Sequence, residues 1–383
     1  MLAKEENGGQ LPILETYWSA LTRISSQYYG AKIDERKLTY SSIRGMLAGL
    51  NDPFTRFLDP DEYKNMREEN EGNFVGIGAQ LDVNNKRQVY VKEPLPDSPA
   101  LAAGIKSGDV IIKVDNKPIA GMAIDEVVKI IRGQVNTKVK LTIQRPHHKK
   151  LIDFVIVRQV VQYRIVQSRM QDEKYKIGYI RLWQFNEHSD QQMDEALSSL
   201  EKKGMRALIF DLRANPGGLL PAAVDIGSRF ADSGPVVVIQ ERGGQKNSLN
   251  VDPSKRNHKK VPLAVLIDNH SASASEIVAG AIRDNKAGVL IGVKTYGKGV
   301  VQTIIPLRDG SAVSITTAKW FTPSGSAINK LGVNPDIVVK APEVGFDSSD
   351  PEKDPQLKKA LEVLREKLES DIKKSGTAKA TIQ

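Results

Sequence analysis

Three residues in one stretch of the chain combine the groups that a serine hydrolase needs. Ser273, Lys298 and Gln302 lie within SASASEIVAGAIRDNKAGVLIGVKTYGKGVVQ (residues 271–302). A hydroxyl can attack, a neutral amine can take its proton, and an amide can orient the amine without adding a charge. The chain has no cysteine and 5 histidines, so thiol and imidazole mechanisms have few residues to use. We predict that Ser273 is a nucleophile, Lys298 its general base and Gln302 the residue that orients the base.

The same residues also have structural explanations, which the sequence leaves open. Ser271 and Ser275 flank Ser273, and small residues before a helix often serve only as a cap, for which Ser275 is a candidate. Lys298 lies in a glycine-rich turn, where surface lysines are common. A lysine base must be neutral when it acts, so burial has to lower its pKa. Apolar neighbours, Tyr296 among them, are expected to supply that burial.

An oxyanion needs backbone N–H donors that no side chain obstructs. Ala274 directly precedes the helix predicted over residues 275–282, so its N–H can face a developing oxyanion at the positive end of that helix. The second donor is expected in DLRANPGGLL (residues 211–220), where an apolar strand runs into Gly217 and Gly218. Either glycine fits the role, and the alternative is a plain turn.

A second glycine motif, FVGIGAQL (residues 74–81), suggests peptide binding. Two glycines beside a strand can expose successive N–H groups to a peptide carboxylate, and the strand edge can pair with the peptide backbone. The alternative is a β-bulge. The motif is too short for the G-x-G-x-x-G of a dinucleotide site.

The composition is that of an ordinary folded protein of several domains. The 383 residues include 40% hydrophobic and 26% charged residues, with a net charge of +9. The basic residues are scattered, which favours solvated loops over nucleic-acid binding and is compatible with contact to an anionic envelope surface. The histidines lack metal-ligand spacing, so we expect no metal and no cofactor.

The sequence leaves the compartment open. No apolar run reaches the length of a membrane span, and the first residues, MLAKEENGGQLP, lack the apolar core of a signal peptide. Either the protein is cytosolic or its export segment is absent from this sequence.

The periodicity divides the chain into four parts. Residues 1–71 are expected to be helical, with an apolar face that packs either on a partner subunit or on its own chain. Residues 72–160 form a small strand-rich domain with two helices, in which Phe74–Val83 reads as one strand. Residues 161–340 alternate strand and helix, with apolar strands expected over 177–182, 263–267 and 289–292, and this alternation is typical of an α/β domain. Residues 341–383 hold one amphipathic helix and a tail, SGTAKATIQ, that we expect to be disordered.

In combination, these motifs resemble the carboxyl-terminal processing proteases, or tail-specific proteases, of peptidase family S41. The resemblance covers roughly residues 40–340. It rests on GLNDPFTRFLDP, VGIGAQL, SPALAAGIKSGDVIIKVD, IGYIRLWQF, DLRANPGG, SASASEI, TYGKGVVQ, WFTPSG and GVNPDI.

The resemblance implies a multidomain α/β fold: a ClpP/crotonase-like core of stacked βαβ units, an inserted PDZ domain and an N-terminal helical segment. It implies a Ser273–Lys298 dyad assisted by Gln302, with Gly217 or Gly218 and Ala274 as oxyanion donors. The substrates would be proteins with free, apolar C-termini.

The family's PDZ carboxylate loop corresponds here to Ile77, Gly78 and Ala79, and Arg145 is a candidate link between this domain and the active site. Two departures from the family pattern are His270, where a glycine often stands, and Ala79, where many PDZ domains carry a bulky apolar residue. His270 leaves an imidazole base as an alternative.

The resemblance also implies an extracytoplasmic location, in the periplasm or cell envelope. The apolar face of the N-terminal helical segment leads us to expect a homodimer formed through helical segments. An adaptor protein is a further expected partner. The competing hypotheses are an inactive PDZ scaffold on a crotonase-like core and a different serine amidase.

Overall fold

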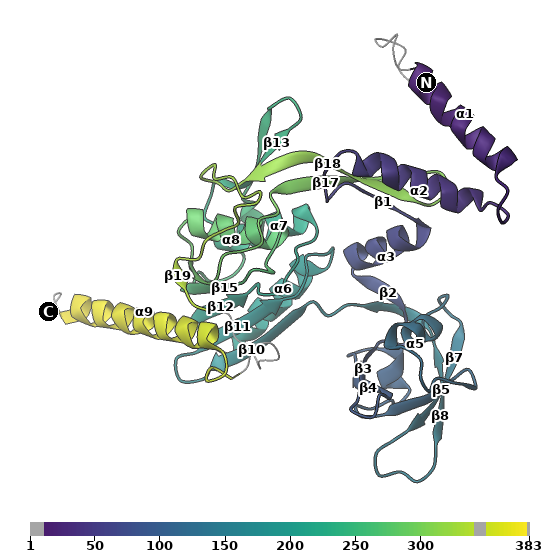
Figure 1. Cartoon of the computed structure of the whole chain (residues 1–383). Helices are drawn as coiled ribbons and strands as arrows, with labels where there is room; N and C mark the ends of the chain where they lie inside the picture. The colour runs from purple at the N-terminus through teal and green to yellow at the C-terminus, as the bar shows by residue number, and fades with distance from the viewer. Residues whose placement is uncertain (1–10, 341–349, 381–383) are drawn as a thin grey trace. The chain divides into compact units, whose positions relative to one another are not determined.

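The computed structural model describes residues 11–340 and 350–380, whose helices and strands are labelled in Figure 1. The chain divides into two compact units, residues 1–63 with 302–316 and residues 64–301 with 317–383. Among the helices of the described residues, none combines the length and the apolar composition that crossing a membrane requires.

The first unit contains the predicted N-terminal helices. These are α1 (Leu11–Gln27), α2 (Glu35–Ala48) and the first residues of α3 (Pro60–Glu71). Asp34 caps α2, since its carboxylate accepts the backbone N–H of Lys37 at 3.0 Å. A short strand, β1 (Arg56–Leu58), pairs antiparallel with the start of β18 (Ala312–Phe321), which also pairs with β17 (Val300–Pro306).

The apolar face of α1 is uncovered in the single chain. Leu14, Tyr17, Trp18 and Ile24 are 57%, 43%, 61% and 46% exposed. Both alternatives, packing of these side chains on a partner subunit and packing on their own chain, stay predictions.

The second unit holds the small strand-rich domain. Its antiparallel sheet has the order β3-β4-β5-β7-β8, with β6 paired to β5, and Val127 and Ile131 of α5 pack into its core. The elements are β3 (Ala79–Val83), β4 (Val89–Pro94), α4 (Pro99–Ala102), β5 (Val110–Val114), β6 (Lys117–Pro118), α5 (Ile124–Ile131), β7 (Lys138–Gln144) and β8 (Ile152–Val157).

The prediction of one strand over Phe74–Val83 was wrong. The segment forms β2 (Asn73–Gly76), which pairs with β9 (Gln159–Gln162), and then β3, which pairs with β4. Gly78 breaks the strand with a φ of 71° and lies against Ser98, so a side chain has no room there.

The α/β domain is built on a six-stranded sheet of order β10-β11-β12-β15-β16-β19. All neighbouring pairs are parallel except β10 with β11. Its strands are β10 (Val166–Asp172), β11 (Ile177–Leu182), β12 (Ala207–Asp211), β15 (Leu263–Ile267), β16 (Val289–Gly292) and β19 (Ile337–Val338).

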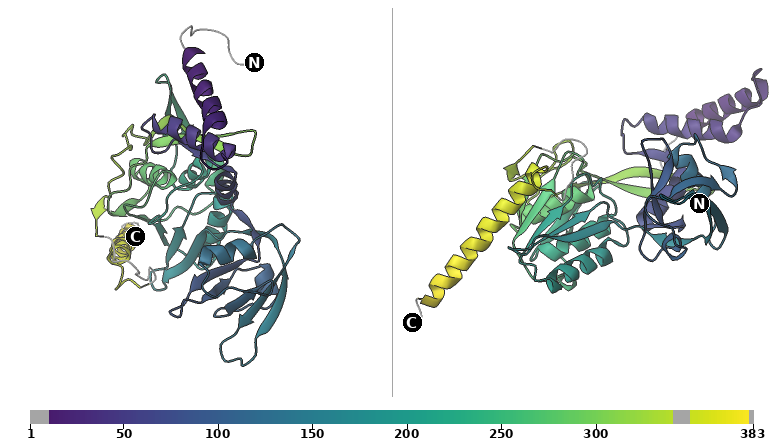
Figure 2. Two further views of the ribbon diagram at one scale, coloured as in Figure 1. Left: turned by 45° about the vertical axis from the view of Figure 1, so that its right-hand side comes forward. Right: turned by 90° about the horizontal axis from the view of Figure 1, so that it is seen from below.

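Helices cover both faces of this sheet, which explains why its strands are continuous apolar runs (Figures 1 and 2). Leu208 and Val265 pack on the face covered by α6, α7 and α8. Ile209 and Leu266 point to the other face, which carries α9. The helices are α6 (Ser189–Lys202), α7 (Leu220–Phe230), α8 (Ala274–Asp284) and α9 (Pro355–Ala380).

The remaining elements connect these layers. β13 (Pro235–Glu241) pairs with β14 (Lys246–Asn250) and with the end of β18, and η1 (Pro253–Lys255) follows.

The prediction of a disordered tail was wrong for residues 375–380, where α9 continues to Ala380. Residues 381–383 lie outside the described residues. The predicted fold class, an α/β core with a strand-rich second domain and N-terminal helices, is confirmed.

Candidate active site

Three neighbouring parallel strands deliver the predicted catalytic loops to one edge of the sheet. Gly217 follows β12, Ser273 follows β15, and Lys298 follows β16. Parallel neighbours end on the same side, and the carboxyl edge of such a sheet is where α/β proteins build their sites. Strand order alone therefore explains why residues distant in sequence meet.

Ser273 stands on a strained turn between β15 and α8. Its φ and ψ are 55° and −114°, a conformation that costs a residue with a side chain about 1–3 kcal/mol. The Ser273 side chain is partly exposed, whereas Ser271 and Ser275 are fully buried. A sharp strand-to-helix turn of this kind presents a hydroxyl to solvent.

The two flanking serines have structural partners. The Ser271 hydroxyl donates to the carbonyl of Leu212 at 2.8 Å, and the Ser275 hydroxyl donates to the carbonyl of Asn215 at 2.9 Å. Both bonds tie the serine turn to the glycine loop. The N-cap position of α8 belongs to Ser273, so the candidate role of Ser275 as the cap was wrong.

One buried carboxylate joins the serine turn to the lysine loop. Glu276 is completely buried. Its Oε2 accepts the backbone N–H groups of Ser273 and Lys298, each at 2.9 Å. Its Oε1 accepts the N–H of Gly297 at 2.7 Å and the hydroxyl of Thr295 at 2.5 Å. Four donors satisfy the buried charge and fix the two backbones relative to each other.

The Lys298 backbone is also held from its carbonyl side. The indole N–H of Trp320, a side chain only 2% exposed, donates to the Lys298 carbonyl at 3.0 Å. The lysine side chain itself is partly buried. Tyr296, expected to line it, is 59% exposed, so the prediction that Tyr296 buries the amine was wrong.

The glycine loop lies directly against the serine turn. A Cβ atom at Gly217 would lie 2.8 Å from Cβ of Ser273 and 2.9 Å from the backbone nitrogen of Ala274. Only glycine permits this approach, and its φ of 102° also excludes side chains. The loop and the nucleophile candidate therefore share one small space.

The two glycines differ in what their N–H groups do. The Gly217 N–H donates to Oδ1 of Asn215 at 2.9 Å. Within the described residues, the N–H groups of Gly218 and Ala274 have no protein acceptor. Among the predicted oxyanion donors, Gly218 and Ala274 are thus the pair with hydrogen-bonding capacity left.

A buried ion cluster supports the start of the glycine loop. Arg213, with a side chain 2% exposed, bonds to Asp211 at 2.6 Å and to Asp354 at 2.8 Å, and Tyr179 donates to Asp211 at 2.6 Å. Burial raises the pKa of the Asp211 carboxyl, but the charge of Arg213 outweighs this and holds that pKa below its ordinary value. Asp354, just before α9, thereby anchors the loop from the far end of the chain.

The remaining predicted residues have other surroundings. Gln302 lies in β17, and its Nε2 donates to Oγ1 of Thr316 at 3.4 Å. His270 is exposed, and its backbone N–H donates to Asp268 at 3.0 Å. Arg145 is bonded to the buried Asp109 at 2.8 Å and to the carbonyl of Gly104 at 2.8 Å. These bonds tie the Arg145 guanidinium to residues of its own domain.

A hollow on the strand-rich domain contains the predicted carboxylate loop. Ile77, Gly78 and Ala79 line it together with Val128 and Ile131 of α5. Within the described residues, the N–H groups of Ile77 and Gly78 have no acceptor. The hollow between β3 and α5 can thus take an extended peptide.

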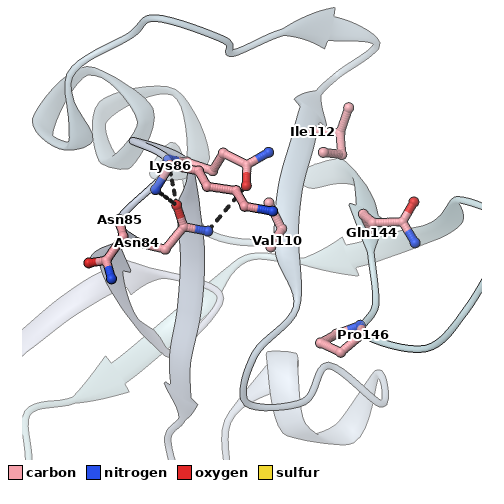
Figure 3. A pocket seen from close by; sticks show the side chains of 8 residues that line it. Asn84, Asn85, Lys86, Val110, Ile112, Gln144 and Pro146 are labelled. Carbon is pink, nitrogen blue, oxygen red and sulfur yellow. Dashed lines mark hydrogen bonds between the residues drawn. The ribbon is translucent and has the colours of Figure 1, made fainter.

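A second hollow on the same domain shares no residue with this groove (Figure 3). Asn84 forms its turn, accepting the N–H of Lys86 at 2.9 Å and that of Gln88 at 3.0 Å. These bonds shape the β3–β4 turn.

Sequence reasoning missed Glu276, although a signal was present. Ser273 and Glu276 have the S-x-x-E spacing of a capping box, which predicts that the glutamate returns to the N-cap amide. The additional bonds to the lysine loop depend on tertiary structure.

Among the described residues, no group of three or more His, Cys, Asp or Glu side chains has the arrangement of a metal site.

Comparison with known proteins agrees with this architecture. Residues 176–339 match peptidase family S41, and residues 66–144 match the PDZ domain. The chain is 36% identical to the carboxyl-terminal-processing protease of Synechocystis sp. over 344 residues, which cover 89% of this chain and 80% of the relative. It is 37% identical to the carboxy-terminal-processing protease of Bartonella bacilliformis, over 86% of this chain and 75% of the relative.

A solved structure gives the same result. The photosystem II D1 C-terminal processing protease superposes with a TM-score of 0.51 at 31% identity, over 91% of this chain and 96% of the other. The chain therefore belongs to the carboxyl-terminal-processing proteases of peptidase family S41 and carries a PDZ domain.

Proposed function

We propose that this protein is a serine endopeptidase that captures the unstructured, apolar C-terminus of a protein in its PDZ groove and cleaves with a Ser273–Lys298 dyad. The observation that carries the proposal is the Glu276 carboxylate, which binds the backbone N–H groups of both dyad residues. An inactive PDZ scaffold is disfavoured, because the relatives are named as proteases.

In the proposed reaction, neutral Lys298 takes the proton of the Ser273 hydroxyl while Oγ attacks a peptide carbonyl. The N–H groups of Gly218 and Ala274 bind the oxyanion, and the protonated lysine then gives its proton to the leaving amine. Water, activated by the same lysine, attacks the acyl-enzyme and releases the acid and Ser273. Gln302 is proposed to orient the lysine amine.

The sequence left both Gly217 and Gly218 as candidate oxyanion donors, and we propose only one of them. Asn215 already occupies the N–H of Gly217, so we assign that glycine to close packing against Ser273. Gly218 is left as the donor from this loop.

An acylating reagent directed at activated serines tests the nucleophile. We expect one adduct, mapped by mass spectrometry to Ser273, and none after Lys298→Ala. An adduct on Ser271, Ser275 or His270 would refute the dyad. Digestion of a folded protein carrying an apolar tail, compared with the same protein carrying a charged tail, tests the substrate class.

We propose from the exposed apolar face of α1 that the protein forms a dimer through this helix. From family membership we propose that it acts in the periplasm or at the cell envelope. An adaptor that delivers substrates is a further proposal. Sedimentation of the full chain and of a Trp18→Glu variant tests the dimer, since Trp18 is 61% exposed in the single chain.

A further inference from the structure

The PDZ sheet has a second face, which points away from the domain core. Along β7, Val139, Leu141 and Ile143 are fully buried in that core together with residues of α5. Successive side chains of a strand point to opposite faces, so Lys138 and Lys140 point away from the core. We call this side of β5, β7 and β8, which is turned away from α5, the outer face.

The edge strand β8 adds exposed apolar side chains to the outer face. Val155 and Val157 are 60% and 37% exposed, and they lie directly opposite Lys140 and Lys138 of β7. Directly opposite side chains on one face of a sheet are close neighbours. Each exposed valine therefore has an ammonium group beside it.

Lysines outnumber carboxylates on the outer face. Asp153 of β8 bonds to Lys140 at 2.8 Å and accepts the hydroxyl of Thr142 at 2.6 Å. The bond from Lys140 holds the pKa of the Asp153 carboxyl below its ordinary value, and the charge of Lys113 in β5 acts in the same direction. In the turn after β5, Asp115 accepts the backbone N–H of Lys140 at 2.8 Å. Both carboxylates are thus already bonded within the domain.

The hollow of Figure 3 lies at one end of the outer face. Val110 and Ile112 of β5 line it, together with Lys86 and Pro146. Gln144, which lies on the same side of β7 as the two lysines of that strand, also lines it and pairs with Val110. The hollow therefore extends the face with an apolar surface and a further lysine.

The β7–β8 loop brings more exposed cations to this end. Lys149, Lys150 and Leu151 are exposed, Leu151 by 49%. The Gln144 side chain donates to the carbonyl of His148, which holds the loop beside the hollow. The lysines of the outer face, its hollow and its loop are Lys86, Lys113, Lys138, Lys140, Lys149 and Lys150.

This combination fits an anionic lipid surface better than a protein partner. Lysine is depleted at protein–protein interfaces, where arginine and aromatic residues supply most of the binding energy. An ammonium group is a compact charge that needs no bidentate partner, so it suits a fluid array of lipid phosphates. Apolar side chains between the lysines gain by entering the boundary between headgroups and acyl chains. Nucleic acid offers the charge but no apolar layer for the valines.

We propose that the outer face of the PDZ domain, with the β7–β8 loop, docks the protein on a membrane that contains anionic lipids. The lysines contact lipid phosphates, and Leu151, Val155 and Val157 enter the headgroup boundary. The peptide groove between β3 and α5 is lined by other residues, so a peptide and a membrane do not compete for the same side chains. The inference concerns where the protein is held and does not depend on the proposed cleavage.

Cosedimentation of the full chain with sucrose-loaded vesicles tests the proposal. One set of vesicles contains phosphatidylglycerol and phosphatidylcholine, and the other contains phosphatidylcholine alone. We expect binding to the first set only, with an affinity that falls as salt is added. The combined variant Lys138→Gln, Lys149→Gln and Lys150→Gln should bind about a hundredfold more weakly, because each lysine near such a surface contributes about fivefold.

A matched variant separates the outer face from net charge. Lys202→Gln, Lys203→Gln and Lys286→Gln together remove the same charge from exposed positions of the α/β domain, and this variant should bind vesicles like the parent. Val155→Thr with Val157→Thr keeps every lysine and should weaken binding without changing its salt dependence. Thermal unfolding of each variant shows that it is folded.

Each result either supports or overturns the proposal. Binding of the parent to neither set of vesicles, or to both equally, overturns it, and so does an equal loss in the two triple variants. A valine variant that binds like the parent overturns the apolar part. A DNA duplex that displaces the protein from anionic vesicles assigns the face to nucleic acid instead. Cleavage of a soluble tailed peptide is measured separately, so failure of docking and failure of the proposed function are distinguishable.

Discussion

Glu276 accepts the backbone N–H of Lys298 at 2.9 Å, 22 residues away along the chain. The same oxygen holds the amide of Ser273, so one buried carboxylate sets the distance between the two backbones. Because all four donors on this carboxylate are neutral, it needs no nearby cation to be satisfied.

Replacing Glu276 with glutamine should reduce kcat about a hundredfold with little change in KM, because small misplacements of catalytic groups carry costs of this size. An amide has one acceptor oxygen, and its NH2 group would face two of the four N–H or O–H donors. Steady-state kinetics check this prediction. Glu173→Gln, at a carboxylate with a 75% exposed side chain, is the control. A folded Glu276→Gln enzyme with normal kcat would show that the carboxylate does not position the dyad.

Removal of either dyad residue should abolish turnover and leave the fold intact. Ser273→Ala removes the nucleophile and Lys298→Ala the base, while Lys298→Arg offers a guanidinium that stays protonated. Peptide hydrolysis and thermal unfolding are measured on each variant. Substantial hydrolysis by any of the three contradicts the dyad.

The rate should also depend on pH in a defined direction. Because the base must be neutral, kcat should rise as the solution becomes more alkaline and Lys298 loses its proton. A pH–rate profile of the unmodified enzyme checks this expectation. A profile that is flat from about pH 6 to about pH 9 contradicts a titrating lysine.

Gly217→Ala should inactivate the enzyme through contact with Ser273. The added methyl would lie 2.8 Å from Cβ of Ser273, which displaces the nucleophile, and the φ of 102° adds strain. We expect at least a hundredfold loss of kcat. Gly243→Ala is the matched control, because Gly243 has a φ of 100° with open space around its Cα. Equal effects of the two substitutions would assign the loss to backbone strain alone.

The Asp211–Arg213 pair should make stability depend on acid pH. The pKa of Asp211 is lowered in the folded protein, so its stabilising effect is complete above the ordinary range of about pH 4 and is lost as the pH falls below it. Asp211→Asn should cost roughly 3 kcal/mol near neutrality, because Arg213 stays buried with fewer partners.

Urea unfolding of both proteins between about pH 7 and about pH 2 measures this difference in the free energy of unfolding. The difference should shrink as the pH falls, since the carboxyl of the parent protein then also loses its charge. A difference that grows on acidification would mean that Asp211 is not held as an anion.

The regular parts of the core were predictable because their signals are local. The apolar runs of β11, β15 and β16 are confirmed as strands, since burial on both faces removes alternation. The helix over 275–282 is confirmed within α8. The strands β10, β17 and β18 were not predicted, because their mixed sequences become strands only through partners elsewhere in the chain.

What the sequence determined by itself was the inventory: a serine before a helix, a lysine between glycines, a glycine pair after a strand and a second glycine loop. Only the tertiary structure decided which hydrogen bonds each member of these sets makes. Ser271 and Ser275 donate to carbonyls of the glycine loop, and the N–H of Gly217 donates to Asn215. Within the described residues, the N–H of Gly218 has no acceptor. The reason is physical: a hydrogen-bond partner is set by proximity in space, and here proximity comes from the order of parallel strands rather than from spacing along the chain.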